Sequence, residues 1–364
     1  MAGRRGRLLI CVVFIVAVAF LVLATPAFAA GPGWTWQNGT FTALEGTADL
    51  PNVAPLGISP EGSYVVGYGV GTTPPVERAL VWHNGTVTEL GTLGLNTSSA
   101  SGVNDAGHAV GAADVAYNKP VAVLFTNGHP GFSHLPSAFS WALQHSTVND
   151  LKKVTLLRAG DAYSVANAIN NYDLVVGDAK MTDGHTWAFA WHAGTMTELP
   201  HLPGWDWSTA YDVNDSGQIV GMAVLTDGTT AAVEWSIGGV VVLPGLPLAQ
   251  PRSIANSINE RGDIAGVAVD SNGDGHAVVW SKVWGKNWSC KAVGGSGSGA
   301  MGINNAGHVV GTARNTSPST APLVHAFLYR NNGMIDLGTL LPWLTSEATA
   351  ISNQNIVIGS NDYV

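Results

Sequence analysis

The sequence predicts an all-β fold, a seven-bladed β-propeller made of four-stranded repeats of about 44 residues. Three observations indicate this fold. A short strand ending in glycine recurs at Gly67, Gly111, Gly177, Gly221, Gly266, Gly311 and Gly359, at intervals of 44, 66, 44, 45, 45 and 48 residues. An aromatic position also recurs seven times, as Trp36, Trp82, Phe125, Trp191, Trp235, Trp280 and Tyr329. The chain begins with the second half of a repeat and ends with the first half.

Each repeat reads as four short strands. Residues 300–311 (AMGINNAGHVVG) show the first half, which is an apolar strand, an Asn-x-x-Gly turn and a second apolar strand. Asn and Gly tolerate the positive φ angles that tight turns need. In the fourth repeat we expect strands at 210–214, 218–223, 231–235 and 240–243. Four strands within about 44 residues are typical of a propeller blade.

The two chain ends carry complementary halves of one repeat. Residues 34–44 hold the third and fourth strands, and residues 348–360 hold the first and second. A blade assembled from both ends closes the ring and leaves no unpaired edge strand. The alternative is an open β-solenoid, which gives no reason for a chain to begin and end in mid-repeat. We therefore predict a closed ring.

The first 29 residues have the features of a secretory signal peptide. Three arginines precede an apolar run over 8–24, and the segment 1–29 ends on an Ala-x-Ala sequence. This pattern predicts export to the extracellular space or the periplasm, with cleavage after Ala29. Residues 30–364 then form a single propeller domain. The alternative is that the apolar run stays in place as a membrane anchor.

Composition restricts the partners of this domain. Residues 30–364 contain 13 basic and 25 acidic side chains, a formal charge of −12. Nucleic acids and anionic membranes are unfavourable partners for such a surface. Cys290 is the one cysteine of this part, so no disulfide can form within it. The 45 glycines and the low content of charged residues suit short strands and tight turns.

One interval departs from the repeat length. Gly111 and Gly177 are 66 residues apart, about 21 more than the usual spacing, and the surplus lies at about 128–150. Phe139, Trp141 and Leu143 occupy alternate positions inside it. Such an insert either adds a strand pair to its blade or forms a long loop on one propeller face.

The repeat resembles a known family. His325-Ala326-Phe327-Leu328-Tyr329, followed by Asp-Leu-Gly-Thr-Leu at 336–340, resembles the HAF repeat of bacterial extracellular proteins. Residues 89–94 (ELGTLG) and 303–307 (INNAG) are similar to other parts of that repeat. The resemblance covers nearly all of the chain after the signal segment, although the His-Ala-Phe triplet occurs once. It implies secretion and a repeat architecture, and it implies no biochemical activity.

Residues 270–275 (DSNGDG) resemble the first half of a calcium-binding loop. Asp270, Asn272 and Asp274 place oxygen donors at positions 1, 3 and 5, and a glycine follows at position 6. The bidentate acid expected at position 12 is missing, because Ser281 stands there. The alternative is a plain hairpin turn. Calcium is the one cofactor that the sequence suggests.

The leading candidate binding site is aromatic. Trp205, Asp206 and Trp207 lie in an expected connection between two repeats, and Trp343 lies in another connection of the same kind. All such connections emerge on one face of a propeller. A tryptophan ring can cover the face of a pyranose while an acidic side chain accepts hydrogen bonds from sugar hydroxyls. The alternative is that these indoles pack between blades.

No catalytic motif is found in the sequence. Residues 297–302 match G-x-G-x-x-G, but a strand follows rather than a helix, so we reject a dinucleotide site. A hydrolase or lyase would need two facing carboxylates, for which Asp212, Asp215, Glu234 and Glu260 are candidates. The sequence favours an exported, non-catalytic binding module for a carbohydrate or another extracellular protein. The alternatives are a polysaccharide-acting enzyme on a propeller scaffold and a purely structural cell-surface protein.

Overall fold

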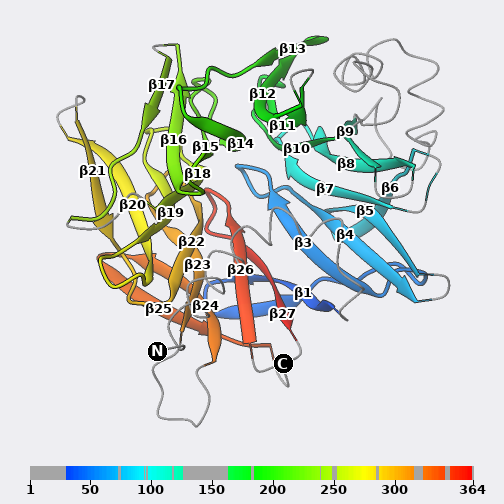
Figure 1. Cartoon of the computed structure of the whole chain (residues 1–364). Helices are drawn as coiled ribbons and strands as arrows, with labels where there is room; N and C mark the ends of the chain where they lie inside the picture. The colour runs from blue at the N-terminus through cyan, green and yellow to red at the C-terminus, as the bar shows by residue number, and fades with distance from the viewer. Residues whose placement is uncertain are drawn as a thin grey trace, which may run out of the picture.

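The computed structural model describes residues 30–362, apart from 73–74, 94, 96, 117–118, 126–162, 182–183, 238, 248–251, 284–286, 315–322 and 341–344. The described residues form 27 strands and no helix. They make six four-stranded antiparallel sheets and one sheet of which three strands are described. The sheets are arranged as blades around a common axis (Figure 1). The predicted seven-bladed β-propeller is confirmed.

Six blades take their strands from one continuous stretch of chain. Blade 1 contains β3 (Asn52–Ile58), β4 (Tyr64–Thr72), β5 (Pro75–His83) and β6 (Thr86–Gly91). Blade 2 contains β7 (Ser98–Val103), β8 (Ala109–Ala116) and β9 (Lys119–Phe125). Blade 3 contains β10 (Ser164–Ile169), β11 (Val175–Lys180), β12 (Thr186–His192) and β13 (Thr195–Glu198). Blade 4 contains β14 (Trp205–Val213), β15 (Ile219–Leu225), β16 (Thr230–Ser236) and β17 (Gly239–Val242). Blade 5 contains β18 (Ser253–Ile258), β19 (Ile264–Val269), β20 (Gly275–Val283) and β21 (Asn287–Ala292). Blade 6 contains β22 (Ser298–Ile303), β23 (Val309–Arg314), β24 (Val324–Arg330) and β25 (Gly333–Gly338).

Blade 7 is assembled from both chain ends, as predicted. Its strand order is β26 (Thr345–Ile351), β27 (Val357–Asp362), β1 (Ala30–Gln37) and β2 (Thr40–Ala43). β1 pairs antiparallel with β27, and Trp34 lies opposite Gly359. Trp34 is fully buried in the core that this blade shares with blade 6. Main-chain hydrogen bonds between the two ends therefore close the ring.

The first strand of each blade lies nearest the axis and the outermost strand lies at the rim (Figure 1). Neighbouring blades contact each other through these first strands. Because successive strands alternate in direction, each end of the ring collects one class of turn. The end that we name the turn face holds the turns between first and second strands, such as 214–217. The other end, the connection face, holds the turns between second and third strands and the connections between blades.

The recurring glycine lies where the second strand comes too close to the first for any side chain. A Cβ added at Gly177 would overlap the carbonyl oxygen of Val165, and one at Gly221 would overlap that of Thr209. The first strand carries a β-bulge next to this contact in both blades. A bulge bends its strand and increases its twist. This close approach explains why glycine marks each repeat in the sequence.

The recurring aromatic position provides packing between blades. Trp82, Trp235 and Trp280 are at most 8% exposed. Trp235 donates its indole N–H to the carbonyl of Pro200 at 2.8 Å, and Trp280 donates to that of Pro244 at 2.7 Å. Each indole thereby anchors the connection that leads into its own blade.

A buried asparagine begins the first turn of five consecutive blades. These residues are Asn104, Asn170, Asn214, Asn259 and Asn304, each at most 5% exposed. Each donates its side-chain amide to the backbone carbonyl of the equivalent residue in the next blade, at 2.9–3.1 Å. Each side-chain oxygen accepts backbone N–H groups of its own turn, at 2.9–3.1 Å. We name this series the asparagine ladder.

A second series of hydrogen bonds runs around the whole turn face. In six steps a backbone N–H donates to a side-chain oxygen of the next blade, from Glu61 to Asp105, Asp105 to Asn171, Asn171 to Asp215, Asp215 to Glu260, Glu260 to Asn305 and Asn305 to Asn353. The N–H of Asn353 then donates to the carbonyl of Pro60 at 2.7 Å. Glu61 starts the circuit because Pro60 has no N–H. All seven blades are therefore linked in a closed circuit.

Three sequence predictions fall outside the described residues. They are the signal peptide at 1–29, the insert at about 128–150 and the placement of Trp343. Within the described part of the chain, no helix is long and apolar enough to cross a membrane.

Replacing Asn214 by Ala tests the asparagine ladder. The substitution leaves the carbonyl of Asn259 and the N–H of Gln218 without the partners that Asn214 provides at 3.1 and 2.9 Å. Buried polar groups without partners cost about 1–3 kcal/mol each, so we expect the free energy of unfolding to fall by about 2 kcal/mol or more. Urea denaturation measures this change. Ser216→Ala, at an exposed position of the same turn, is the control. Equal stability of the two variants would contradict a structural role for the ladder.

Candidate functional site

The predicted aromatic segment is only partly available to a ligand. The sequence predicts that Trp205, Asp206 and Trp207 lie in a connection, but β14 begins at Trp205, so this part of the prediction is wrong. Pairing with β15 extends the first strand of blade 4 up to the connection face. Trp205 is 8% exposed and packs edge-on against Trp235, with ring centroids 6.4 Å apart. The core cluster that contains Trp205 also includes Val176 and Ala188 of blade 3, so for Trp205 packing between blades is the correct alternative.

Asp206 and Trp207 line a cavity between blades 3 and 4. The cavity opens on the connection face and has a volume of about 450 Å³. Ligand pockets in proteins commonly have volumes of about 300–1,000 Å³. Its lining residues are Tyr163, Asp178, Gly184, His185 and Thr186 from blade 3 and its preceding segment, and Asp206, Trp207, Thr209 and Tyr211 from blade 4. The fold thus brings two of the predicted site residues together with seven that the sequence analysis did not single out.

Asp178 on β11 forms the buried polar part of this cavity. It is 9% exposed, and its carboxylate accepts the hydroxyl of Thr209 at 2.8 Å. The side chains of Tyr163 and Asn167 donate to it as well. Burial raises the pKa of Asp178 to about 6, and the three hydrogen bonds oppose this rise. The group is therefore mostly ionised at neutral pH although it is buried.

Two tyrosines stand beside this carboxylate. Burial raises the pKa of both Tyr163 and Tyr211 above the ordinary value, and the negative charge of Asp178 adds to the rise. Tyr163 donates its hydroxyl to Asp178. The hydroxyl of Tyr211 is buried and has no hydrogen-bond partner among the described residues. An unpartnered buried hydroxyl is costly, and a ligand in the cavity could supply the missing partner.

A stack of rings supports the rim of the cavity. Nδ1 of His185 lies 2.9 Å from the backbone carbonyl of Asp206 and 3.7 Å from its carboxylate. The ring of the buried Trp187 stacks with His185 at 5.4 Å and with His201 at 4.2 Å. Nδ1 of His201 lies 3.4 Å from the carboxylate of Glu198. These contacts hold the two blades together where the cavity opens.

Asp178 departs from the repeat in a way that the sequence displays. Asp178 directly follows the recurring Gly177 and is paired with Val165 of the first strand. At this position the other repeats carry Tyr68, Ala112, Met222, Val267, Thr312 and Ser360. An acid directly after the repeat glycine is therefore a signal for this site. Its partner Tyr211 is 33 positions further along the chain, and only the packing of blades 3 and 4 brings the two together.

The calcium-like loop has the geometry of a hairpin turn. The carboxylate of Asp270 accepts the backbone N–H groups of Asn272 and Asp274 at 2.8 and 3.0 Å. Its other oxygen lies 3.1 Å from Nε2 of His276. The described residues include no group of three or more His, Cys, Asp or Glu side chains that could hold a metal ion.

The four carboxylates considered for an enzyme all take part in contacts between or within blades. Asp212 accepts the N–H of Ile258 at 2.9 Å, and burial raises its pKa to about 6. Asp215 and Glu260 belong to the circuit on the turn face. Glu234 is 2% exposed and lies 3.3 Å from Nζ of Lys282. These contacts give each carboxylate a structural role.

A further acidic pair lies where blade 2 meets blade 1. Burial, together with the charge of Asp114, raises the pKa of Glu77 to about 8. Oε1 of Glu77 and Oδ1 of Asp114 are buried without a hydrogen-bond partner among the described residues. Arg78, the next residue along β5, pairs with Glu89 at 3.0 Å. With a pKa of about 8, Glu77 is mostly protonated at neutral pH.

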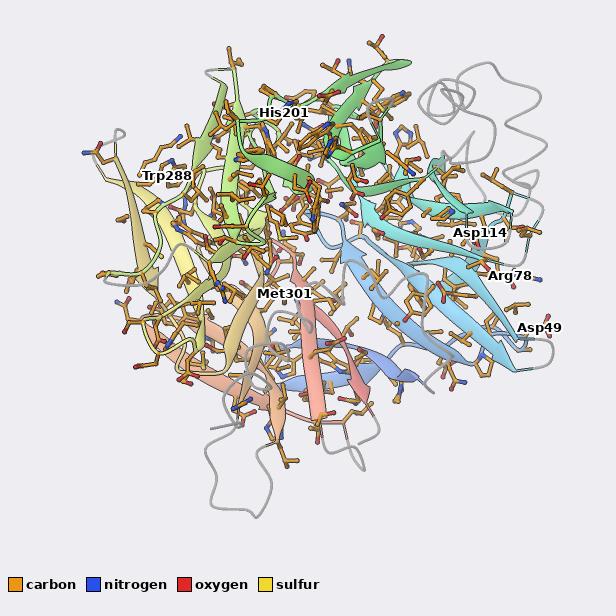
Figure 2. The ribbon with its side chains drawn as sticks, viewed as in Figure 1. Asp49, Arg78, Asp114, His201, Trp288 and Met301 are labelled. Atoms are coloured by element: carbon orange, nitrogen blue, oxygen red, sulfur yellow. The ribbon has the colours of Figure 1, made fainter. Side chains whose placement is uncertain are left out.

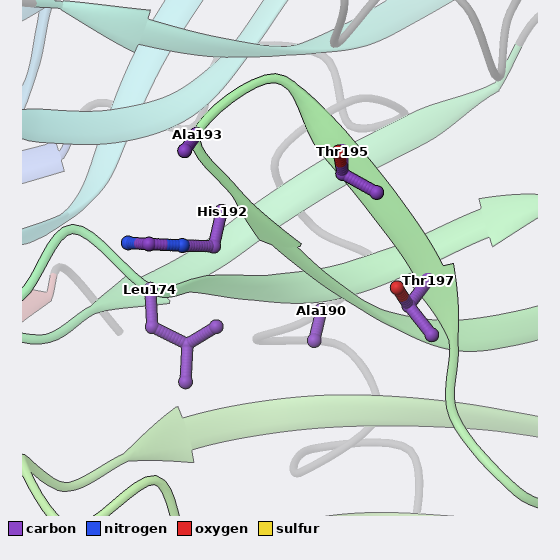
Figure 3. Close-up of a pocket in the computed structure, with 6 residues that line it drawn as sticks. All are labelled: Leu174, Ala190, His192, Ala193, Thr195 and Thr197. Carbon is purple, nitrogen blue, oxygen red and sulfur yellow. The ribbon is translucent and has the colours of Figure 1, made fainter.

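A second cavity, of about 370 Å³, lies on blade 3 near the turn face. It is lined by Leu174, Ala190, His192, Ala193, Thr195 and Thr197 (Figure 3). This lining contains no carboxylate, Lys, Arg, Trp or Tyr. The cavity therefore offers fewer specific contacts than the one between blades 3 and 4.

Several solved structures are similar to this chain. No family model and no curated protein matches the chain. Among solved structures, the β-propeller domain of the trilobed protease from Pyrococcus furiosus is similar, with a TM-score of 0.51, 11% identity, and coverage of 82% of this chain and 83% of that one. A putative TolB from Agrobacterium tumefaciens gives 0.47 and 12%, covering 93% and 100% of the two chains. The BP39L lectin from Burkholderia pseudomallei gives 0.40 and 11%, covering 84% and 92%. At these identities the similarity shows the propeller fold alone.

The raised pKa of Asp178 predicts a pH-dependent stability. The folded-state pKa of about 6 exceeds the ordinary value of 3.8. The stabilising contribution of this group is therefore fully present below about pH 4 and is lost as the pH rises through about 6. The variant Asp178→Asn lacks this pH dependence. We therefore expect the free energy of unfolding of the variant, minus that of the original protein, to be about 2–3 kcal/mol larger at pH 7 than at pH 4.

Urea denaturation of both proteins at several pH values measures this difference. The other raised groups, Glu77 and Asp212, are unchanged in the variant and cancel in the comparison. A stability difference that stays constant between pH 4 and pH 7 would show that Asp178 has an ordinary pKa.

Proposed function

We propose that this protein is a non-catalytic binding module that recognises a carbohydrate through the cavity between blades 3 and 4. One observation carries the proposal. A single cavity combines the aromatic rings of Tyr163, Trp207 and Tyr211 with the buried carboxylate of Asp178. The sequence also favours a carbohydrate as the partner. It predicts a site on an exposed connection, whereas we propose the cavity between blades 3 and 4.

This combination of groups suits a sugar. A pyranose has apolar faces that pack on aromatic rings and an edge of hydroxyls that need hydrogen-bond partners. Asp178 and Asp206 can accept hydrogen bonds from these hydroxyls. The unpartnered hydroxyl of Tyr211 can form a hydrogen bond with the ligand. Trp205 precedes Asp206 on β14 and packs against Trp235, which anchors this end of the strand.

Export agrees with this function. Residues 1–29 have the features of a signal peptide, and the HAF-like repeat is one of extracellular proteins. We therefore propose that the propeller acts outside the cytoplasm on a glycan or another extracellular polymer. The formal charge of −12 on residues 30–364 disfavours nucleic acids as its partner.

Retention on immobilised cell-wall and plant polysaccharides tests the proposal. The chain as exported is compared with Trp207→Ala, and we expect the variant to bind about tenfold more weakly or worse because it loses an aromatic wall. Trp288→Ala is the control, since Trp288 lies on the outermost strand of blade 5, on another part of the ring (Figure 2). Runs with and without calcium distinguish a contribution of the Asp270 loop. Failure to retain any polysaccharide would exclude a carbohydrate partner.

Tyr211→Phe provides a test that separates binding from folding. The hydroxyl that it removes has no partner among the described residues, so the stability of the variant should be unchanged or higher. Its affinity for the retained polysaccharide should fall about threefold to tenfold, the value of one hydrogen bond. Thermal unfolding and binding are measured on the same preparation. Unchanged affinity would remove Tyr211 from the site.

A further inference from the structure

We infer that the ligand of this cavity is an amino sugar whose protonated amine lies beside Asp178. The inference rests on the proposed function and narrows it to one chemical class. Its basis is a buried carboxylate that lies in a ligand-sized cavity and lacks a cationic partner among the described residues.

The negative charge of Asp178 has no charged partner among the groups that donate to it. All three groups that donate to its carboxylate are neutral, namely Thr209, Tyr163 and Asn167. A carboxylate can accept about four hydrogen bonds, so one position remains for a ligand. A buried charge is stabilised chiefly by an opposite charge, and neutral donors compensate it only in part. An ammonium group at the open position would provide that charge.

The rest of the lining is acidic and aromatic. It contains a second carboxylate, Asp206, and neither Lys nor Arg. The cation nearest along the same strand is Lys180, whose side chain is not part of the lining. Aromatic rings, which make up much of the wall, also attract cations through their faces. An acidic sugar would be repelled here, while an amino sugar is attracted by every charged group except a protonated His185.

An acid at the position of Asp178 occurs in one repeat of the seven. Each of the other six repeats carries a residue other than an acid at the position of Asp178. The chemistry described here is therefore present at one of the seven positions between blades. We expect one ligand per protein molecule, in contrast to the seven that a fully repeated site would bind.

The experiment compares two oligosaccharides with the same backbone. Isothermal titration calorimetry is carried out on the chain as exported, with a tetramer of glucosamine and with a tetramer of N-acetylglucosamine. Acetylation removes the positive charge and leaves the ring unchanged. We expect the glucosamine tetramer to bind about tenfold more tightly or better, with a stoichiometry of one.

Two matched variants locate the effect. Asp178→Asn keeps the shape of the side chain and removes its charge, so the preference should fall to about twofold or less. Asp227→Asn changes an exposed acid in the second turn of blade 4, and its preference should equal that of the original protein.

The outcomes separate this inference from the proposed function. Equal or tighter binding of the acetylated tetramer overturns the inference and leaves a carbohydrate site in place. A preference for glucosamine that both variants retain, or that both lose alike, assigns it to general surface charge and also overturns the inference. No binding of either tetramer or of any polysaccharide overturns both proposals. If Asp178→Asn does not fold, the preference for the glucosamine tetramer and the stoichiometry are still measured on the original protein. These two values, with the Asp227→Asn control, then test the inference.

Discussion

The asparagine ladder is the interaction on which the rest of the ring depends. Apolar packing holds neighbouring blades together, but it is non-directional and would tolerate small rotations. Each ladder amide, by contrast, must meet one carbonyl of the next blade at about 3 Å, because a buried amide without a partner is costly. The outer circuit adds a link at every blade, including the one from Asn353 to Pro60. The blade assembled from both chain ends therefore fits the same circuit as the others.

The connection face is free of this constraint, and the departures from the repeat that form the site are found there. The first turn of each blade needs its amide and carbonyl groups for the ladder, so its sequence is restricted. Asp178, Trp207 and Tyr211 differ from the residues at the same positions of the other repeats, and none of the three takes part in the ladder or the circuit of the turn face. A scaffold held at one end can thus carry a specific cavity at the other. This separation of stability from recognition is a common property of repeat folds.

Part of the site can be predicted from the sequence, and the rest cannot. Asp206 and Trp207 stand next to each other in the chain, so their chemistry is visible without structure. Asp178 and Tyr211 come from different repeats, and no local pattern shows that they meet. Trp205 was misplaced because pairing with Leu225 extends β14 beyond the repeat's usual strand. That pairing turns the indole into the core against Trp235.

The sequence by itself determined the number of blades, the strand order and the closure by both ends. These properties follow from local periodicity, because a repeated glycine and a repeated aromatic residue impose the same backbone contact in every unit. Only the tertiary structure decided which side chains share a cavity and which acids are neutral or ionised. Such properties depend on burial and on the register between blades. The acid at position 178 is visible in the sequence, but its proximity to the unpartnered hydroxyl of Tyr211 arises only where blades 3 and 4 pack.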